Sequence, residues 1–135
     1  MGLEVVFGDA FYFIACINDR DAAHQRVFAV SSQEGLRIVT TDYVLLEVAD
    51  ALAGTRLRAA VLPFVESLRY SHMASIVPAS QELLDDGMRL YANRYDKGWS
   101  LTDCISFVVM RSRGITEALT ADRHFEQAGF MALLK

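Results

Sequence analysis

The sequence has few of the residues that cross-link or interrupt a chain. Among 135 residues there are only two cysteines and two prolines. Cys16 and Cys104 form no CxxC motif, so we expect neither a disulfide framework nor a thiolate zinc site. A chain of this length buries enough surface to fold without such supports. We therefore expect one domain that spans residues 1–135.

Long hydrophobic runs are also missing. The longest uninterrupted apolar run, Ala10–Ile17, has eight residues, whereas a bilayer-spanning helix needs about 20. The first residues lack the basic start and the small-residue cleavage site of a signal peptide. We therefore expect no membrane segment and a cytoplasmic location.

Positive charge is not in excess. Thirteen Lys and Arg face 17 Asp and Glu, which gives a net charge of −4. This balance argues against a protein that coats nucleic acid through bulk positive charge. It leaves open an enzyme that handles nucleic acid through a bound metal and a few local cations.

Short β-branched runs alternate with helical patterns along the chain. The runs predict five strands, at Glu4–Phe7, Arg37–Thr41, Ser75–Pro78, Thr116–Thr120 and, more weakly, Phe130–Leu133. Their mostly apolar character is typical of strands buried on both faces. Helices are predicted at Asp21–Gln33, Tyr43–Ala53, Arg56–Leu68, Ser80–Tyr95 and Leu101–Arg113. This alternation predicts an α/β fold with a mainly parallel sheet of four to five strands.

Four carboxylates occupy informative places in this pattern. Asp9 directly follows the first strand, and Asp122 follows the fourth by two residues. Glu47 lies about one turn into the helix after the second strand, and Asp103 lies in the first turn of the helix before the fourth. Ligands bind at the carboxyl ends of parallel strands. We therefore expect these four acids to gather at one end of the sheet.

Each acid also has an ordinary structural interpretation. Asp9 could cap a helix that starts near Phe11, and Ser100 with Asp103 fits a capping box. Asp122 could be a first-turn acid that the helix dipole favours. Glu47, however, falls on the shoulder of an apolar helix arc, where an unpaired charge is costly. A hard divalent cation with oxygen ligands, best Mg²⁺, would stabilise such a group of acids.

The same residues resemble a known family. The chain resembles the PIN domain, especially the small ribonucleases of VapC-type toxins. The segments that carry the resemblance are Val6-Phe7-Gly8-Asp9, Thr40-Thr41-Asp42-Tyr43-Val44-Leu45-Leu46-Glu47, Ser100-Leu101-Thr102-Asp103-Cys104 and Leu119-Thr120-Ala121-Asp122-Arg123-His124-Phe125. They occur in the family's order and span nearly the whole chain.

The resemblance implies a three-layer α/β/α domain and a metal-dependent endoribonuclease that leaves a 5′-phosphate and a 3′-hydroxyl. It implies that Asp9, Glu47, Asp103 and Asp122 form a catalytic Mg²⁺ or Mn²⁺ site, supported by the hydroxyl of Thr120. The toxin of a type II toxin–antitoxin pair would act on RNA, bind a cognate antitoxin and form a homodimer. One departure is Ala10, which stands where such proteins commonly carry Ser or Thr.

An acidic protein needs local cations to meet RNA. Arg94, Lys97 and Arg123 lie close in sequence to the expected site and are candidates for phosphate contacts, although each could also be an ordinary solvated charge. Trp99 and His124 could stack on a base. Packing in the core is the alternative for Trp99.

Two other classes of protein compete with this interpretation. The first is a catalytically inactive PIN scaffold that binds RNA or protein, against which the four retained acids argue. The second is a receiver-like or haloacid-dehalogenase-like protein, which also places Asp at strand ends. Such proteins need a second acid beside or two residues from the first, and neither Gly8 nor Ala10 nor Phe11 supplies it.

Overall fold

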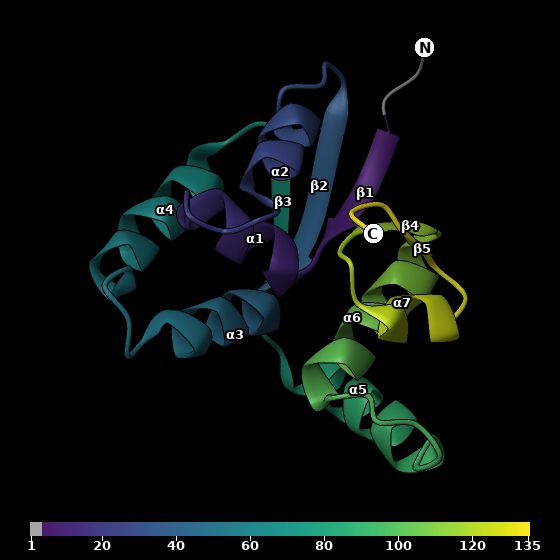
Figure 1. The fold of residues 1–135 in the computed structure, drawn as a ribbon. Coiled ribbons are helices and arrows are strands. Elements are labelled where there is room, and N and C mark those ends of the chain that lie inside the picture. Colours follow the sequence, from purple (N-terminus) through teal and green to yellow (C-terminus); the bar gives the residue numbers. More distant parts are fainter. Residues whose placement is uncertain (1–3) are drawn as a thin grey trace.

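Five parallel strands form the centre of the fold (Figure 1). The computed structural model describes residues 4–135, so residues 1–3 of the predicted domain lie outside the described part. The strands are β1 (Glu4–Gly8), β2 (Leu36–Thr41), β3 (Ala74–Val77), β4 (Glu117–Leu119) and β5 (Met131–Ala132). Their order is β3-β2-β1-β4-β5, and each neighbouring pair is parallel. The predicted α/β class with a five-stranded sheet is confirmed.

Helices cover both faces of this sheet. They are α1 (Ala10–Ile17), α2 (His24–Ser31), α3 (Asp42–Leu52), α4 (Arg58–Tyr70), α5 (Gln81–Asn93), α6 (Leu101–Arg113) and α7 (Arg123–Gln127). Figure 1 shows α1–α4 gathered on one side of the sheet and α5–α7 on the other. This arrangement gives the three layers that the resemblance implied.

Most predicted elements agree with the structure to within a few residues. The helix predicted at Leu101–Arg113 is α6, and it ends at Gly114 with φ +67°, a left-handed conformation that glycine adopts readily. The helix predicted at Asp21–Gln33 begins later, at His24. The reason is a turn in which the Asp21 carboxylate accepts a hydrogen bond from the Ala23 N–H at 2.8 Å.

The prediction that every strand is buried on both faces was wrong at the edges of the sheet. The edge strand β3 is only partly buried, and in β5, on the other edge, Met131 is 59% exposed. A strand at an edge has a neighbour on one side only, so the helices cover it less completely. The inner strands β1 and β4 end in buried residues, which leads the chain into the interior.

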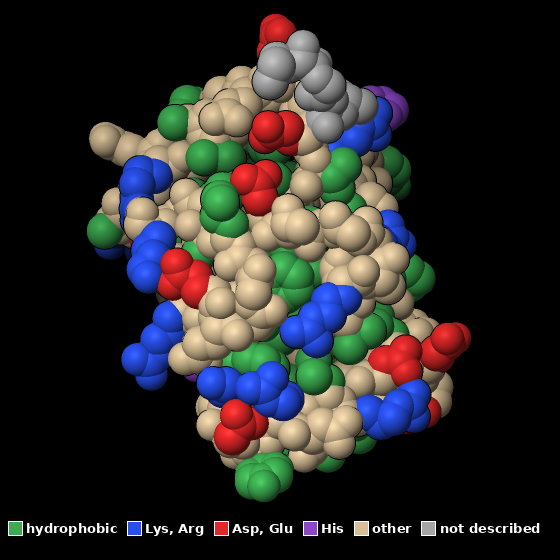
Figure 2. Space-filling view, turned by 90° about the vertical axis from the view of Figure 1, so that its right-hand side faces the viewer, with side chains coloured by type: hydrophobic (Ala, Val, Ile, Leu, Met, Phe, Trp, Pro, Cys, Tyr) green, Lys and Arg blue, Asp and Glu red, His purple; other side chains and the backbone are tan. Residues whose placement is uncertain are grey.

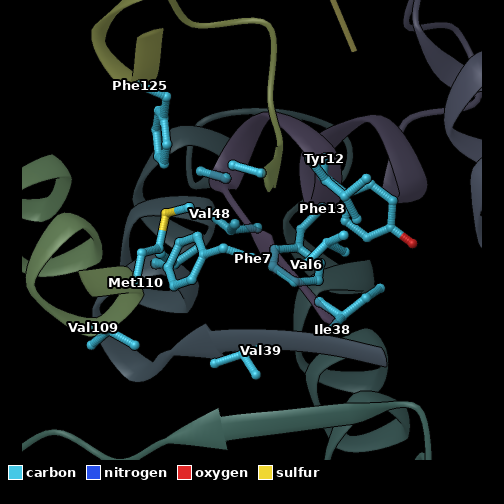
Figure 3. Packing of buried hydrophobic residues seen from close by; sticks show 14 of the residues in the cluster. Val6, Phe7, Tyr12, Phe13, Ile38, Val39, Val48, Val109, Met110 and Phe125 are labelled. Atoms are coloured by element: carbon cyan, nitrogen blue, oxygen red, sulfur yellow. The ribbon is translucent and has the colours of Figure 1, made fainter. Parts of the chain in front are cut away.

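The core joins the two helical layers through the sheet. Figure 3 shows Phe7 of β1 among side chains from α1, α3, α6 and α7. The ring of Phe107 on α6 meets Trp99 and Phe125 edge-on, each at a centroid distance of 5.0 Å. These aromatic contacts fix α6 and α7 relative to each other, and both helices carry predicted site residues at their amino ends.

None of the described helices is both long and apolar enough to cross a membrane.

Candidate active site

An acidic cleft lies where the carboxyl ends of the inner strands meet. The strand order reverses at β1, because β2 follows on one side of it and β4 on the other. Such a switch point opens a crevice between neighbouring loops. A cavity of about 480 Å³ is found there. Its lining residues are Asp9, Ala10, Phe11, Glu47, Gly98, Ser100, Asp103, Ala121, Asp122 and His124. All four predicted acids therefore line one cleft.

Asp9 is held by a side chain from a distant strand. It occupies the N-cap position of α1, yet its side chain makes no capping hydrogen bond. Its Oδ2 instead accepts a hydrogen bond from the Thr120 hydroxyl at 2.7 Å. The same hydroxyl accepts the Asp122 N–H at 3.0 Å. Thr120 thus connects the first acid, after β1, to the fourth acid, after β4.

Asp103 caps its own helix and also lines the cleft. The predicted capping box is confirmed, since the Asp103 carboxylate accepts the Ser100 N–H and the Ser100 hydroxyl accepts the Asp103 N–H. The residue is only 7% exposed and also lines the cleft. The interpretation of Asp103 as a capping residue is therefore confirmed, and its role in a metal site stays a prediction.

His124 belongs to the site, which the sequence did not reveal. Its Nδ1 lies 3.1 Å from Oδ2 of Asp103 and 3.5 Å from Oδ1 of Asp122. Ligand atoms of these three residues all lie within 4.8 Å of one another, so they form a group that could hold a metal ion. The sequence offered only a base-stacking hypothesis for His124. The missed signal is its position two residues after Asp122, whose carboxylate accepts the His124 N–H at 2.9 Å.

The cleft brings several carboxyl groups together where they are partly or largely buried. Burial raises the pKa of Asp9 to about 6, although hydrogen bonds from Thr120 and the Ala10 backbone lower it. Burial, followed by repulsion from the other three acids, raises the pKa of Glu47 to about 7. Burial also raises the pKa of Asp103. Within residues 4–135, neither Asp9 nor Glu47 forms an ion pair with a basic side chain.

These donors fit a hard divalent cation. Carboxylate oxygens are the ligands that Mg²⁺ and Mn²⁺ prefer, and the raised pKa values mark acids that lack compensating charge. One imidazole next to several carboxylates is compatible with the same metals. The chemistry of the lining residues thus fits a divalent metal ion.

The predicted substrate-binding cations lie outside this cleft. Arg94 and Lys97 line a second cavity, which shares Gly98 with the acidic one. Arg123 is exposed at the first turn of α7. Trp99 is only 4% exposed, and its Nε1 donates to Oε1 of Gln127 at 3.0 Å. Of the two interpretations of Trp99, packing in the core is confirmed.

The departure from the family pattern lies within the site. Ala10 is the first residue of α1 and lines the acidic cleft. A Ser or Thr at this position would place a hydroxyl at the cleft, and Ala10 does not. The four acids are unaffected by this change.

Comparison with known proteins agrees with this geometry. The family model described as PIN domain matches residues 6–131. The chain belongs to the PIN domain family. One curated relative from Mycobacterium tuberculosis, the 23S rRNA-specific endonuclease VapC20, is 25% identical over 130 residues. That match covers 94% of this chain and 96% of the relative.

Several solved structures share the fold. The crystal structure of Mycobacterium tuberculosis VapC20, described as a toxin that cleaves the sarcin-ricin loop, has a TM-score of 0.85 and 23% identity, covering 95% of this chain and 98% of that one. FitAcB from Neisseria gonorrhoeae has a TM-score of 0.64 at 15% identity and 94% coverage of both chains. DNA-bound VapBC from Salmonella typhimurium has a TM-score of 0.63 at 16% identity and 96% coverage of both chains.

Proposed function

We propose that this PIN-domain chain is a metal-dependent endoribonuclease that hydrolyses phosphodiester bonds in RNA. One observation carries the proposal: carboxylates from four separate places in the chain converge on one cleft at the switch point of the sheet. Burial, together with repulsion from the neighbouring acids, raises the pKa values of Asp9 and Glu47, as expected of a site built to hold a cation.

Each acid of the cleft has its own role in this proposal. Asp9, Asp103 and Asp122 hold Mg²⁺ or Mn²⁺, directly or through water, with Thr120 orienting Asp9. A bound divalent ion supplies water of lowered pKa and stabilises negative charge on the phosphate. Glu47 accepts a hydrogen bond from the attacking water or is a further ligand. Its raised pKa suits a group that takes up a proton near neutral pH.

The biological setting follows from the relatives. VapC20 is a 23S rRNA-specific endonuclease, and its crystal structure is described as that of a toxin. We propose that this chain is likewise the toxin of a type II pair, with a cognate antitoxin as partner, a homodimeric state and a cytoplasmic location. Ribosomal RNA is accordingly the first substrate to test. Arg94, Lys97 and Arg123 are proposed to meet its phosphates.

Cleavage of purified ribosomal RNA and total RNA by the purified protein tests the activity. Reactions with Mg²⁺, with Mn²⁺ and with chelator are compared for the wild type and for Asp103→Asn. The Asn side chain keeps an acceptor for the Ser100 N–H, so the capping box survives while the charge is lost. We expect discrete fragments with metal, none with chelator and at least 100-fold slower cleavage by Asp103→Asn.

Asp19→Asn is the matched control, since it removes the same charge from a side chain that is 77% exposed and lies away from the cleft. It should cut at the wild-type rate. A folded wild type that cuts neither RNA with either metal, and whose melting temperature does not respond to metal, would contradict the nuclease. That result would favour an inactive scaffold that binds RNA or protein.

A further inference from the structure

A second cavity, of about 390 Å³, lies next to the acidic cleft. It is lined by Tyr91, Ala92, Arg94, Tyr95, Lys97, Gly98, Trp99 and Cys104. Gly98 lines both cavities, and a Cβ built on it would meet no atom within 4 Å. The two cavities are therefore neighbours, with open space at the residue they share.

Exposed aromatic rings distinguish this second cavity. Tyr95 is 91% exposed and Tyr91 is 53% exposed, although both rings have apolar faces that packing would normally cover. Trp99, by contrast, is buried against Phe107. Exposed rings in a pocket provide a surface on which an unpaired nucleobase can stack, whatever the base.

Positive charge lies beside these rings. Arg94 donates from Nε and Nη2 to the Asp96 carboxylate at 3.0 and 3.2 Å, and its guanidinium lies 5.0 Å from the centroid of Trp99. These contacts hold the turn that follows α5. Within residues 4–135, Lys97 has no ion-pair partner among the acidic side chains. Its ammonium group is thus available to a phosphate.

The surface view agrees with this description. Figure 2 shows basic side chains, with acidic ones between them, next to hydrophobic side chains at the lower end of the molecule, where Figure 1 places α5. A polyanion that enters the acidic cleft needs such a region, because the cleft itself repels phosphates until a cation is bound.

We propose that Tyr91, Tyr95 and Lys97 form a nucleotide subsite that holds an unpaired base and its phosphate next to the bond that is cut. This inference rests on the proposed ribonuclease function and adds the residues that position a nucleotide of the substrate beside the acidic cleft. A nucleotide in the subsite is connected past Gly98 to the scissile phosphate in the acidic cleft. Tyr95 acts by stacking and Lys97 by charge. Removing the Tyr95 ring should therefore leave the salt dependence of RNA binding unchanged, whereas removing the Lys97 charge should reduce it.

Binding of a fluorescein-labelled, mixed-sequence, 12-nucleotide RNA tests these two effects. It is measured by anisotropy with Mg²⁺ in the Asp103→Asn background, which slows cleavage. Tyr95→Ala should raise Kd roughly tenfold with an unchanged salt dependence. Lys97→Ala should also raise Kd, and should reduce the slope of log K against log salt by about 0.7, the value for one phosphate contact with a single strand. In the otherwise wild-type protein, both changes should raise KM for RNA cleavage more than they lower kcat.

Two matched controls accompany these variants. Tyr70→Ala removes a ring that is 84% exposed, and Lys135→Ala removes the same charge as Lys97→Ala. Neither residue lines either cavity, and both controls should behave as the wild type. Equal Kd, salt slope and KM for all four variants would overturn the subsite even if RNA is cut. A change in oligomeric state with unchanged RNA binding would instead assign the surface to a protein interface. Absence of cleavage with Tyr95-dependent binding would overturn the nuclease and retain the subsite.

Discussion

At the scale of single residues, the hydroxyl of Thr120 organises the site. It donates to the buried carboxylate of Asp9 and accepts from the backbone of Asp122, and the residue itself is fully buried. When a buried carboxylate loses such a hydrogen-bond donor, nothing compensates the free-energy cost of its desolvation. The contribution of Thr120 is therefore both to stability and to the position of two acids.

Thr120→Val removes this hydroxyl at nearly constant volume. We expect the free energy of unfolding at pH 7 to fall by about 1–3 kcal/mol, because Asp9 and the Asp122 N–H each lose a partner. The pKa of Asp9 should rise further, since the hydrogen bond from Thr120 lowers it. Urea unfolding and titration of the Asp9 carboxyl by NMR measure the two effects. Thr120→Ser retains the hydroxyl and should lie much nearer the wild type; equal losses in both variants would refute this role.

At the scale of elements, α5 and α6 approach closely through a glycine. Gly87 is buried in α5, and a Cβ built there would overlap Cγ1 of Ile105 and lie 3.4 Å from its Cα. This contact sets the distance between the two helices. It therefore also sets where α6 presents Asp103 and where the turn after α5 presents Lys97.

Gly87→Ala should lower the free energy of unfolding by about 1–3 kcal/mol, the usual cost of overpacking. The expected sign is informative, because Ala is otherwise favoured over Gly in a helix interior by about 1 kcal/mol. Urea unfolding measures the change. Gly54→Ala, where a Cβ meets nothing within 4 Å, is the control. The double variant Gly87→Ala, Ile105→Ala should lose less free energy of unfolding than the two single variants together, because the smaller side chain at 105 makes room for the added Cβ. Strictly additive losses would contradict the contact.

At the scale of the whole molecule, the acidic cleft connects stability to pH. The folded-state pKa of Asp9 is about 6 instead of 3.8, and that of Glu47 is about 7 instead of 4.5. Between about pH 4 and 7 the folded chain consequently binds more protons than the unfolded chain. By linkage, the stability that these two groups contribute decreases as pH rises through that window.

Melting temperatures between pH 5 and 8 test this linkage. In chelator, the double variant Asp9→Asn, Glu47→Gln should gain stability relative to the wild type as pH rises, by a few degrees at pH 8. Mg²⁺ should stabilise the wild type more at pH 8 than at pH 5, because it binds the ionised carboxylates in competition with protons. Glu66→Gln, at an exposed position, is the control. Parallel pH profiles of the double variant and the wild type would contradict the linkage.

Much of the fold was predictable because its signals are local. Apolar runs, caps and glycines depend on neighbours within a few residues, which is why the bounds of α6 and its capping box at Ser100 and Asp103 were predicted correctly. The same holds for the placement of acids after β1 and β4, since parallel strands present their carboxyl ends on one edge. The limits of α2 and the exposure of β3 were not predicted, because they depend on a turn and on the edge of the sheet.

The sequence by itself determined the alternation of strands and helices, the four acids and the family to which they point. Only the tertiary structure decided that the Asp9 side chain contacts Thr120 instead of capping α1, and that His124 lies beside Asp103. It alone placed Lys97 and Tyr95 in a cavity next to the cleft. The physical reason is that local patterns fix a residue's element and its approximate face. Hydrogen bonds and burial depend on atoms that other parts of the chain bring near, and those neighbours exist only once the sheet and both helical layers have assembled.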